Sequence, residues 1–147
     1  MALKFQIQNP IFQINMTSEE LKFRTKKFAL RVMNLIETLP NKMSGKVVAN
    51  QLLRSATSAG ANYRSACRSR SKVEFISKIR IVEEEADESL YWLELIKESG
   101  LVKEVRISEL IEEASELTAI FTSIGKTSKQ NLKYSKSEIP NSKSKNA

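Results

Sequence analysis

Apolar side chains recur in steps of three and four residues along several long stretches of the chain. Because a helix completes a turn every 3.6 residues, this spacing gathers apolar positions on one helical face. Alternation typical of a strand is confined to Leu3, Phe5 and Ile7, where we expect a short strand or an ordered arm. The helical stripes are Leu21, Phe28, Val32, Leu35 and Leu39, with Thr25 filling a gap; Phe75, Ile79, Val82, Ala86, Leu93 and Ile96, with Ser89 filling a gap; and Leu110, Ala114, Leu117, Phe121 and Ile124.

Capping signals predict where these helices begin and end. Thr17 and Glu20 have the spacing of a capping box before the first helix, and Ser71 and Glu74 repeat it before the third. Pro40 is expected to end the first helix. Gly100 suits the left-handed position after a third helix that ends at residue 98. The fourth helix should begin between residues 104 and 108.

The second helix is predicted from near Ser44 to about Arg68. Every side chain in residues 55–62 is small, and Gly60 would cost a helix about 1 kcal/mol relative to Ala. A loop is therefore the competing interpretation. We favour a helix whose small face lets a neighbouring backbone approach closely.

These boundaries predict one all-α domain flanked by two short segments. Residues 1–16 form an N-terminal arm, residues 17–133 the helical domain, and residues 134–147 a basic, Lys- and Ser-rich tail that we predict to be disordered. Short connections between helices favour antiparallel neighbours. We therefore predict an antiparallel up-down-up-down four-helix bundle.

Charge is distributed unevenly along the 147 residues, whose net charge is +7. Residues 1–80 carry 15 basic and 4 acidic side chains, whereas residues 81–125 carry 3 basic and 12 acidic ones. Residues 126–147 carry 6 basic and 1 acidic side chain. Two compatible interpretations stay open: acidic and basic helices attract one another within the bundle, or a basic face binds nucleic acid or an acidic partner.

The residue types that are missing exclude most catalytic and metal sites. With no His, the chain lacks the commonest general base and the ligands of His-containing zinc and di-iron sites. A single cysteine, Cys67, excludes an internal disulfide, and neighbouring arginines predict a lowered thiol pKa. We predict no enzymatic activity, no cofactor and no metal site. A carboxylate-only Mg²⁺ or Mn²⁺ site in residues 83–88, or a metal-dependent hydrolase using Glu85 and Glu88, is the catalytic alternative.

No stretch of the sequence has the features of a membrane span or a signal peptide. The uninterrupted apolar runs are far shorter than the roughly 20 residues needed to cross a bilayer. The N-terminal residues lack a compact apolar segment followed by a small-residue cleavage site. We expect a cytoplasmic protein with no membrane partner.

Two groups of basic residues are candidates for binding nucleic acid. One lies between residues 64 and 80, and the other lies on the first helix, at Lys22, Arg24, Lys26, Lys27 and Arg31. Such density gives salt-dependent binding to phosphate backbones with little sequence selectivity. Solvated charge without a function is the alternative. The predicted phosphate-contacting residues are Arg64, Arg68, Arg70, Lys72, Lys78 and Arg80, with Lys26 and Lys27 as secondary candidates.

Two carboxylates of the third helix, Glu85 and Glu88, stand between apolar and aromatic residues. Carboxylates in such surroundings are costly unless they are paired. Arg54, among the small residues of the second helix, is the natural partner. We predict an ion pair that fixes helix register or a subunit contact, with solvated surface charge as the alternative.

The first and third helices carry more apolar surface than one buried face requires. Tyr91, Trp92 and Leu95 extend the third helix beyond its core stripe, as Leu30 and Ile36 extend the first. Aromatic residues are enriched in subunit interfaces. We predict a homo-oligomer with Tyr91, Trp92 and Leu95 at the interface.

Four sequence motifs resemble a known family. LRSATS at residues 53–58, GANYR at 60–64, EADES at 85–89 and YWLEL at 91–95 are similar to the four-helix-bundle proteins encoded in intervening sequences of bacterial 23S ribosomal RNA genes. The likeness covers about residues 20–125. Ser89 stands where that family usually has Thr.

That family is also similar to the accessory variability protein of diversity-generating retroelements, a basic ring of five bundles that works with a reverse transcriptase and nucleic acid. The resemblance implies a homopentamer and binding to RNA or DNA, and it carries over no catalytic residues. Our leading hypothesis is a non-enzymatic oligomer that binds structured RNA or DNA through backbone charge. The alternative is a structural adaptor that docks an acidic protein or a reverse-transcriptase-like partner.

Overall fold

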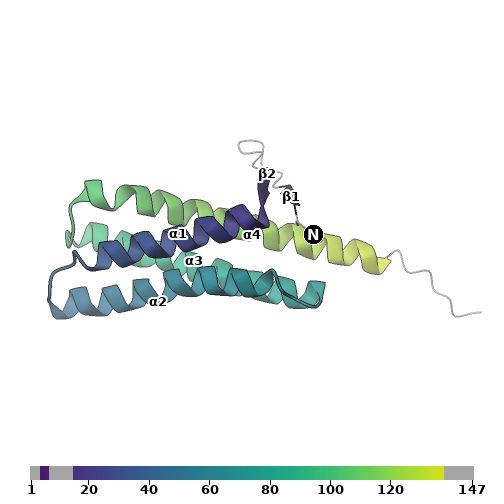
Figure 1. Ribbon diagram of the computed structural model, residues 1–147, viewed down its shortest axis with the longest axis horizontal. Coiled ribbons are helices and arrows are strands. Elements are labelled where there is room, and N and C mark those ends of the chain that lie inside the picture. The colour runs from purple at the N-terminus through teal and green to yellow at the C-terminus, as the bar shows by residue number, and fades with distance from the viewer. Residues whose placement is uncertain (1–3, 7–14, 138–147) are drawn as a thin grey trace, which may run out of the picture.

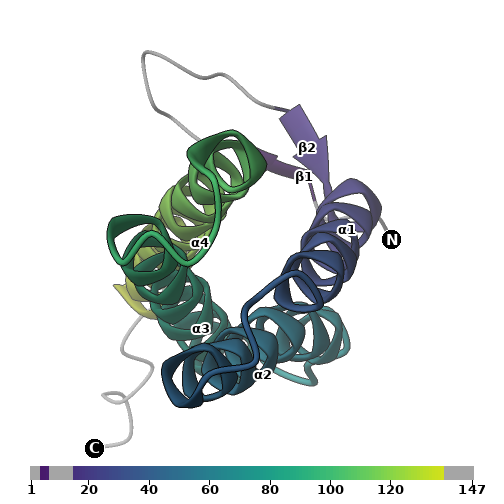
Figure 2. The same cartoon turned by 90° about the vertical axis from the view of Figure 1, so that its left-hand side faces the viewer.

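The computed structural model describes residues 4–6 and 15–137, most of which lie in four long helices. Each helix runs antiparallel to the next, and the four surround a common core in the order α1, α2, α3, α4 (Figures 1 and 2). The predicted all-α four-helix bundle is confirmed. The elements are β1 (Lys4–Gln6), β2 (Asn15–Thr17), α1 (Ser18–Ile36), α2 (Met43–Ala66), α3 (Lys72–Glu98), the 3₁₀ turn η1 (Glu104–Arg106) and α4 (Ser108–Ser137).

The predicted apolar stripes form the core. Every stripe residue is buried except Leu39 and Phe75, which pack against the core at its margin. The polar residues that fill gaps in the stripes, Thr25 and Ser89, are buried as well. The Thr25 hydroxyl donates a hydrogen bond to the Leu21 carbonyl at 3.0 Å, so its burial leaves no polar group unsatisfied.

The capping box predicted at the start of α1 is present. Thr17 Oγ1 accepts a hydrogen bond from the Glu20 N–H at 3.2 Å, and the Glu20 carboxylate accepts one from the Thr17 N–H at 2.7 Å. The latter bond lowers the pKa of Glu20. The helix ends at Ile36, before the predicted stop at Pro40. The N–H groups of Thr38 and Leu39 bond to carbonyls three residues earlier, so the chain forms tighter turns there instead of continuing the α-helix.

The small residues 55–62 are helical, as predicted, and they lie between two neighbouring helices. A Cβ atom added at Gly60 would lie 3.6 Å from the Thr25 carbonyl oxygen of α1, so these two backbones approach closely. Towards α3, Ser55 Oγ lies 2.9 Å from Ser89 Oγ in a buried contact. α2 ends at Ala66 rather than near Arg68, since the turn to α3 begins there.

The signals around α3 are confirmed in part. Ser71 Oγ accepts the Glu74 N–H at 3.1 Å, as a cap should. The Glu74 carboxylate, however, accepts the N–H of Arg70 rather than that of Ser71, so the capping box is incomplete. At the other end, Gly100 has φ +69°, the left-handed conformation predicted for it.

α4 is longer than predicted. It continues to Ser137, past the boundary placed at residue 133, and its last turns project beyond the other helices (Figure 1). The prediction of a disordered tail is therefore wrong for residues 134–137, and residues 138–147 lie outside the described residues. Polar composition indicated disorder, but residues 126–137 contain no Gly or Pro to end the helix.

The predicted arm contains a short antiparallel pair of strands. Phe5 of β1 pairs with Met16 of β2, while Leu3 and Ile7 lie outside the described residues. Thr17 ends β2 and caps α1, so the second strand leads directly into the bundle. Figure 2 shows the pair beside α1 and α4.

Candidate nucleic-acid interface

The connection between α2 and α3 gathers four of the predicted phosphate-contacting residues. Arg64 lies in the last turn of α2, Arg68 and Arg70 follow it, and Lys72 begins α3. This is the end of the bundle at which α1 begins and α4 finishes (Figure 1). All four side chains are exposed, and none forms an ion pair with a described residue. We call Arg64, Arg68, Arg70 and Lys72 the basic turn.

The other two residues of this group are partly neutralised by carboxylates. Lys78 Nζ lies 3.0 Å from the Glu74 carboxylate and donates a hydrogen bond to Ser65 Oγ at 2.9 Å. The Arg70 N–H and Lys78 lower the pKa of Glu74, which keeps that carboxylate charged. Arg80 Nε lies 3.0 Å from a Glu84 oxygen. Lys78 and Arg80 are therefore less available to a phosphate than the basic turn.

Lys26 lies close to the basic turn across a groove between α1 and α2. The groove has a volume of about 590 Å³, and its lining includes Lys22, Lys26 and Arg64. Glu19, the acidic residue of the lining, lies 2.7 Å from Lys22 Nζ. The groove thus brings together Lys26 and Arg64, which the sequence placed in two separate groups.

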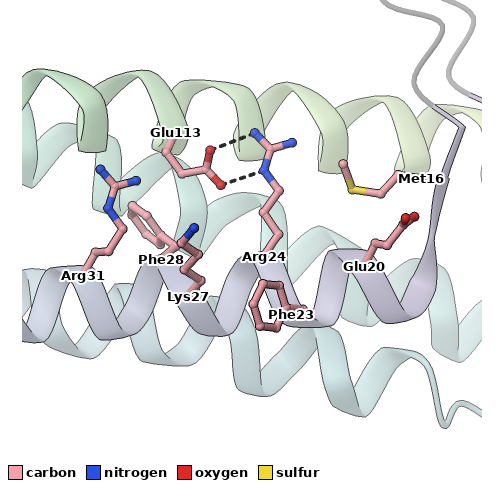
Figure 3. Close-up of a pocket in the computed structure, with 8 residues that line it drawn as sticks. All are labelled: Met16, Glu20, Phe23, Arg24, Lys27, Phe28, Arg31 and Glu113. Atoms are coloured by element: carbon pink, nitrogen blue, oxygen red, sulfur yellow. Dashed lines mark hydrogen bonds and ion pairs between the residues drawn. The ribbon is translucent and has the colours of Figure 1, made fainter.

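The rest of the first-helix group is divided by contacts with α4. Arg24 donates two hydrogen bonds to Glu113, from Nε at 2.7 Å and from Nη2 at 2.8 Å (Figure 3). It also contacts Glu116. Arg31 Nη2 lies 3.0 Å from a Glu109 oxygen. Arg24 and Arg31 therefore join α1 to α4 and are not free to bind phosphate.

The acidic partners on α4 were not singled out in the sequence analysis. Glu109, Glu113 and Glu116 are spaced four and three residues apart, so they share one helical face. That spacing was a readable signal for an acidic stripe facing a basic helix. It confirms the first of the two interpretations of the uneven charge, for this pair of helices.

Lys27 lies on the same side of α1 as these ion pairs. It lines a pocket of about 420 Å³ between α1 and α4, with Phe23, Arg24 and Glu113 among its neighbours (Figure 3). Lys27 is exposed, and it forms no ion pair with a described residue. Lys26 lines the groove between α1 and α2 instead, so the two lysines line different cavities.

The predicted contacts of Arg54 are present. Its Nη1 lies 3.3 Å from both Glu85 oxygens, and its Nη2 contacts Glu88. Glu88 also accepts the indole N–H of Trp92 at 3.0 Å. Arg54 and this N–H lower the pKa of Glu88. The cluster joins α2 to α3, whereas its role in register or assembly stays a prediction.

Tyr91, Trp92 and Leu95 differ in how far they are exposed. Tyr91 is 55% exposed, and its ring meets that of Trp92 edge-on with centroids 5.0 Å apart. Trp92 and Leu95 are half-buried and pack against the core of their own bundle. Tyr91 is therefore the member of this predicted interface that has most surface left for a second chain.

α1 presents an apolar row that the sequence analysis identified only in part. Phe23, Leu30 and Met33 are 69%, 52% and 46% exposed, and their spacing places them on one face. Leu30 was singled out, whereas Phe23 and Met33 were missed. Ile36, which was singled out with Leu30, packs against the core instead.

Comparison with known proteins identifies the family. Residues 20–123 match the family described as 23S rRNA-intervening sequence protein, which is more than half of the chain. The chain belongs to this family. The family resemblance stated from the four motifs is thereby confirmed, and the further relation to the retroelement protein stays a prediction.

A solved member of the same group shares the fold of this 23S rRNA-intervening sequence protein. It is a protein with unknown function from the S23 ribosomal protein family of Bacteroides thetaiotaomicron VPI-5482, known from a crystal structure. The two chains are 35% identical with a TM-score of 0.67, over 72% of this chain and 98% of the other. No curated protein matches the chain.

The family match includes the basic turn and the Arg54 cluster, and it leaves out the strand pair and the end of α4. The predicted site residues therefore all lie within the part of the chain that the 23S rRNA-intervening sequence family shares. The projecting turns of α4 do not.

The carboxylates in residues 83–88 of this family member point to different partners. Glu83 accepts a hydrogen bond from Thr122, Glu84 contacts Arg80, and Glu85 and Glu88 share Arg54. Within residues 4–6 and 15–137, no cluster of three or more potential ligands is placed to hold a metal ion.

The predicted low pKa of the Cys67 thiol is wrong. Burial raises the pKa of Cys67, and the Tyr63 hydroxyl and Lys22 offset this effect only in part. The neighbouring arginines are exposed, so the cysteine does not share their environment. Cys67 packs against the core, as a small helix-packing residue would.

None of the helices among the described residues combines the length and the apolar character that crossing a bilayer requires.

Proposed function

We propose that this family member is a non-enzymatic, oligomeric bundle protein that binds RNA or DNA through the phosphate backbone, in the cytoplasm. The observation that carries the proposal is the basic turn: four exposed cations from adjacent elements, with no carboxylate paired to any of them among the described residues. Cations in that arrangement attract a polyanion and release its counterions on binding.

The pairing of other cations supports the same proposal. Arg24, Arg31 and Arg54 are paired with carboxylates of a neighbouring helix, so their charge contributes to the bundle itself. The acidic stretch of the sequence neutralises these residues and leaves the basic turn untouched. The basic turn therefore keeps its positive charge towards solvent, whereas the charge of Arg24, Arg31 and Arg54 is neutralised within the bundle.

The oligomeric part of the proposal rests on exposed apolar surface. Phe23 and Leu30 on α1 are more than half exposed, and so is Tyr91 on α3. The chain therefore has two exposed apolar patches, one on each of these helices. Two different patches on one chain favour head-to-tail contacts, which form a ring when the rotation between neighbouring chains closes. Five copies in that ring is what the resemblance to the retroelement protein implies, and a ring would repeat the basic turn around its rim.

Salt titration tests the binding proposal. We would measure the affinity for labelled RNA and DNA by fluorescence anisotropy and compare R64Q/R68Q/R70Q/K72Q with the control K42Q/K46Q/K103Q/R106Q. The control removes the same charge from exposed residues at the opposite end of the bundle. The basic-turn variant should reduce the slope of log affinity against log salt by about 2–4, since each phosphate contact contributes about 0.9.

Two results would contradict the binding proposal. One is the absence of binding by the unmodified protein at low salt, and the other is an equal loss of affinity in both variants. The adaptor alternative makes a separate prediction, a specific acidic or reverse-transcriptase-like protein that stays bound after nuclease treatment and is lost with the basic turn.

A further inference from the structure

The end of α4 carries a row of lysines that neither the core nor the basic turn explains. Lys126, Lys129, Lys133 and Lys136 follow one another in steps of three, four and three, which places them on one helical face. All four are exposed, and none forms an ion pair with a described residue. We call these residues the lysine stripe.

The stripe is unfavourable for the isolated helix. Like charges three and four residues apart repel each other, and residues 117–137 contain no Asp or Glu to offset them. Only the last turn benefits from the negative end of the helix dipole. The last turns of α4 also project past the other helices, which leaves them little packing to offset this repulsion (Figure 1). An anionic partner along the stripe would remove the repulsion.

The composition of the other faces distinguishes between anionic partners. A helix that lies on a lipid surface needs a wide apolar face opposite its cations. The side of α4 turned away from the lysines carries the polar residues Ser128, Asn131 and Ser135. Residues 126–137 contain two apolar or aromatic side chains, Leu132 and Tyr134. This part of α4 therefore favours a phosphate backbone over a membrane.

The form of the stripe favours a duplex over a single strand. Binding of single strands combines cations with aromatic side chains on which bases stack. Tyr134, the aromatic residue of this segment, lies about 100° of helix rotation from Lys133 and so off the face that carries the lysines. At about 1.5 Å rise per residue the stripe is about 15 Å long. That length matches several phosphates along one backbone.

We infer that the lysine stripe is a second nucleic-acid contact, which holds the phosphate backbone of duplex RNA or DNA at the same end of the bundle as the basic turn. The inference deepens the proposed function and rests on it. It also assigns a role to a part of α4 that lies outside residues 20–123, the region shared with the family.

The test neutralises the stripe in the full-length protein. K126Q/K129Q/K133Q/K136Q should bind a duplex of about 20 base pairs at least about tenfold more weakly at physiological salt, with a smaller salt slope, since each phosphate contact contributes about 0.9 to that slope. The control K42Q/K46Q/K103Q/R106Q, with the same net charge, should bind as the unmodified protein does. Circular dichroism verifies that each variant is as helical as the parent.

The outcomes separate this inference from the proposed function. If the stripe variant binds the duplex normally while R64Q/R68Q/R70Q/K72Q does not, the stripe inference fails and the proposed function stands. If the unmodified protein binds neither duplexes nor single strands, both fail. An equal loss in the control, or a loss confined to single strands or to phosphatidylserine vesicles, also overturns the inference.

Discussion

At the scale of single residues, two glycines of α2 have different reasons to be glycine. A Cβ atom at Gly45 would lie 2.4 Å from the Pro40 carbonyl oxygen, closer than real Cβ contacts come. At Gly60 the nearest atom would be the Thr25 carbonyl oxygen at 3.6 Å, which is ordinary contact. Gly45 is therefore required by the α1–α2 turn, whereas Gly60 occupies a position that can hold Ala.

We predict opposite effects for the two alanine substitutions. Gly60→Ala should raise the free energy of unfolding by about 0.5–1 kcal/mol, since Ala restricts the unfolded chain and favours the helix. Gly45→Ala should lower it by about 1–3 kcal/mol through overpacking. Urea unfolding followed by circular dichroism measures both. A destabilised Gly60→Ala would show that the α1–α2 contact is tighter than these distances indicate.

Single-residue predictions from the sequence were reliable where the cause is local. The Thr17 cap and the Gly100 conformation depend on neighbours in the chain, and both are confirmed. The prediction of a lowered pKa for Cys67 was wrong because burial raises this pKa, and the sequence neighbours of Cys67 do not reveal its burial.

At the scale of elements, the α2–α3 contact combines a buried hydroxyl contact with a half-exposed ion cluster. Ser55 meets Ser89 in the interior, and the preceding residue of α2, Arg54, meets Glu85 and Glu88 nearer the surface. The Glu85 side chain is 18% exposed and that of Glu88 is 35% exposed. Removing the guanidinium would leave two partly buried carboxylates facing each other without a cation.

We predict that Arg54→Met lowers the melting temperature at neutral pH and that the difference disappears in acid. Arg54 lowers the pKa of Glu88 from 4.5, so its stabilising effect is complete above that value. The effect is lost as the pH falls through the lowered pKa, where the carboxylate of the folded protein takes up a proton. Thermal unfolding across this pH range measures the change.

Arg80→Met is the matched control for Arg54→Met. Its side chain is 73% exposed and contacts Glu84 on its own helix, so its removal should change the melting temperature little. Equal effects of the two substitutions, or no effect of Arg54→Met on stability or assembly, would contradict a specific role for the cluster.

Element boundaries were predicted less well than element positions. The 3.6-residue period located α1, α3 and α4, because burial of one apolar face is what stabilises them. It carries no information about where a polar helix stops, and α4 accordingly runs on to Ser137. The Arg24–Glu113 pair joins residues far apart in the chain, so only the packing of α1 against α4 could reveal it.

At the scale of the whole molecule, antiparallel packing sorts charge by end. The basic turn and the lysine stripe lie at the same end of the bundle because α2 and α4 finish where α1 and α3 begin (Figure 1). The acidic residues Glu109, Glu113 and Glu116 lie in the first half of α4, towards the opposite end. One end of the bundle is thus suited to a polyanion.

We predict that the protein in solution has a mass several times the 16.7 kDa of one chain, five times if the resemblance to the retroelement protein holds. Phe23→Ser and Tyr91→Ser should each reduce the mass towards that of one chain, because a head-to-tail ring needs both patches. Light scattering after size-exclusion chromatography measures it. Val105→Ser, at a residue 82% exposed in η1, is the control. A 16.7 kDa species for the unmodified protein would contradict the proposal.

The sequence by itself determined the class of fold, the core residues and the family. The reason is that the amphipathic period, the helix caps and the family motifs each depend on residues that are close together in the chain. It also determined an excess of positive charge. Only the tertiary structure decided which cations are available: packing pairs Arg24 and Arg31 with α4 and leaves the basic turn unpaired. The physical reason is that pairing depends on distances between side chains remote in the chain, and composition does not record those distances.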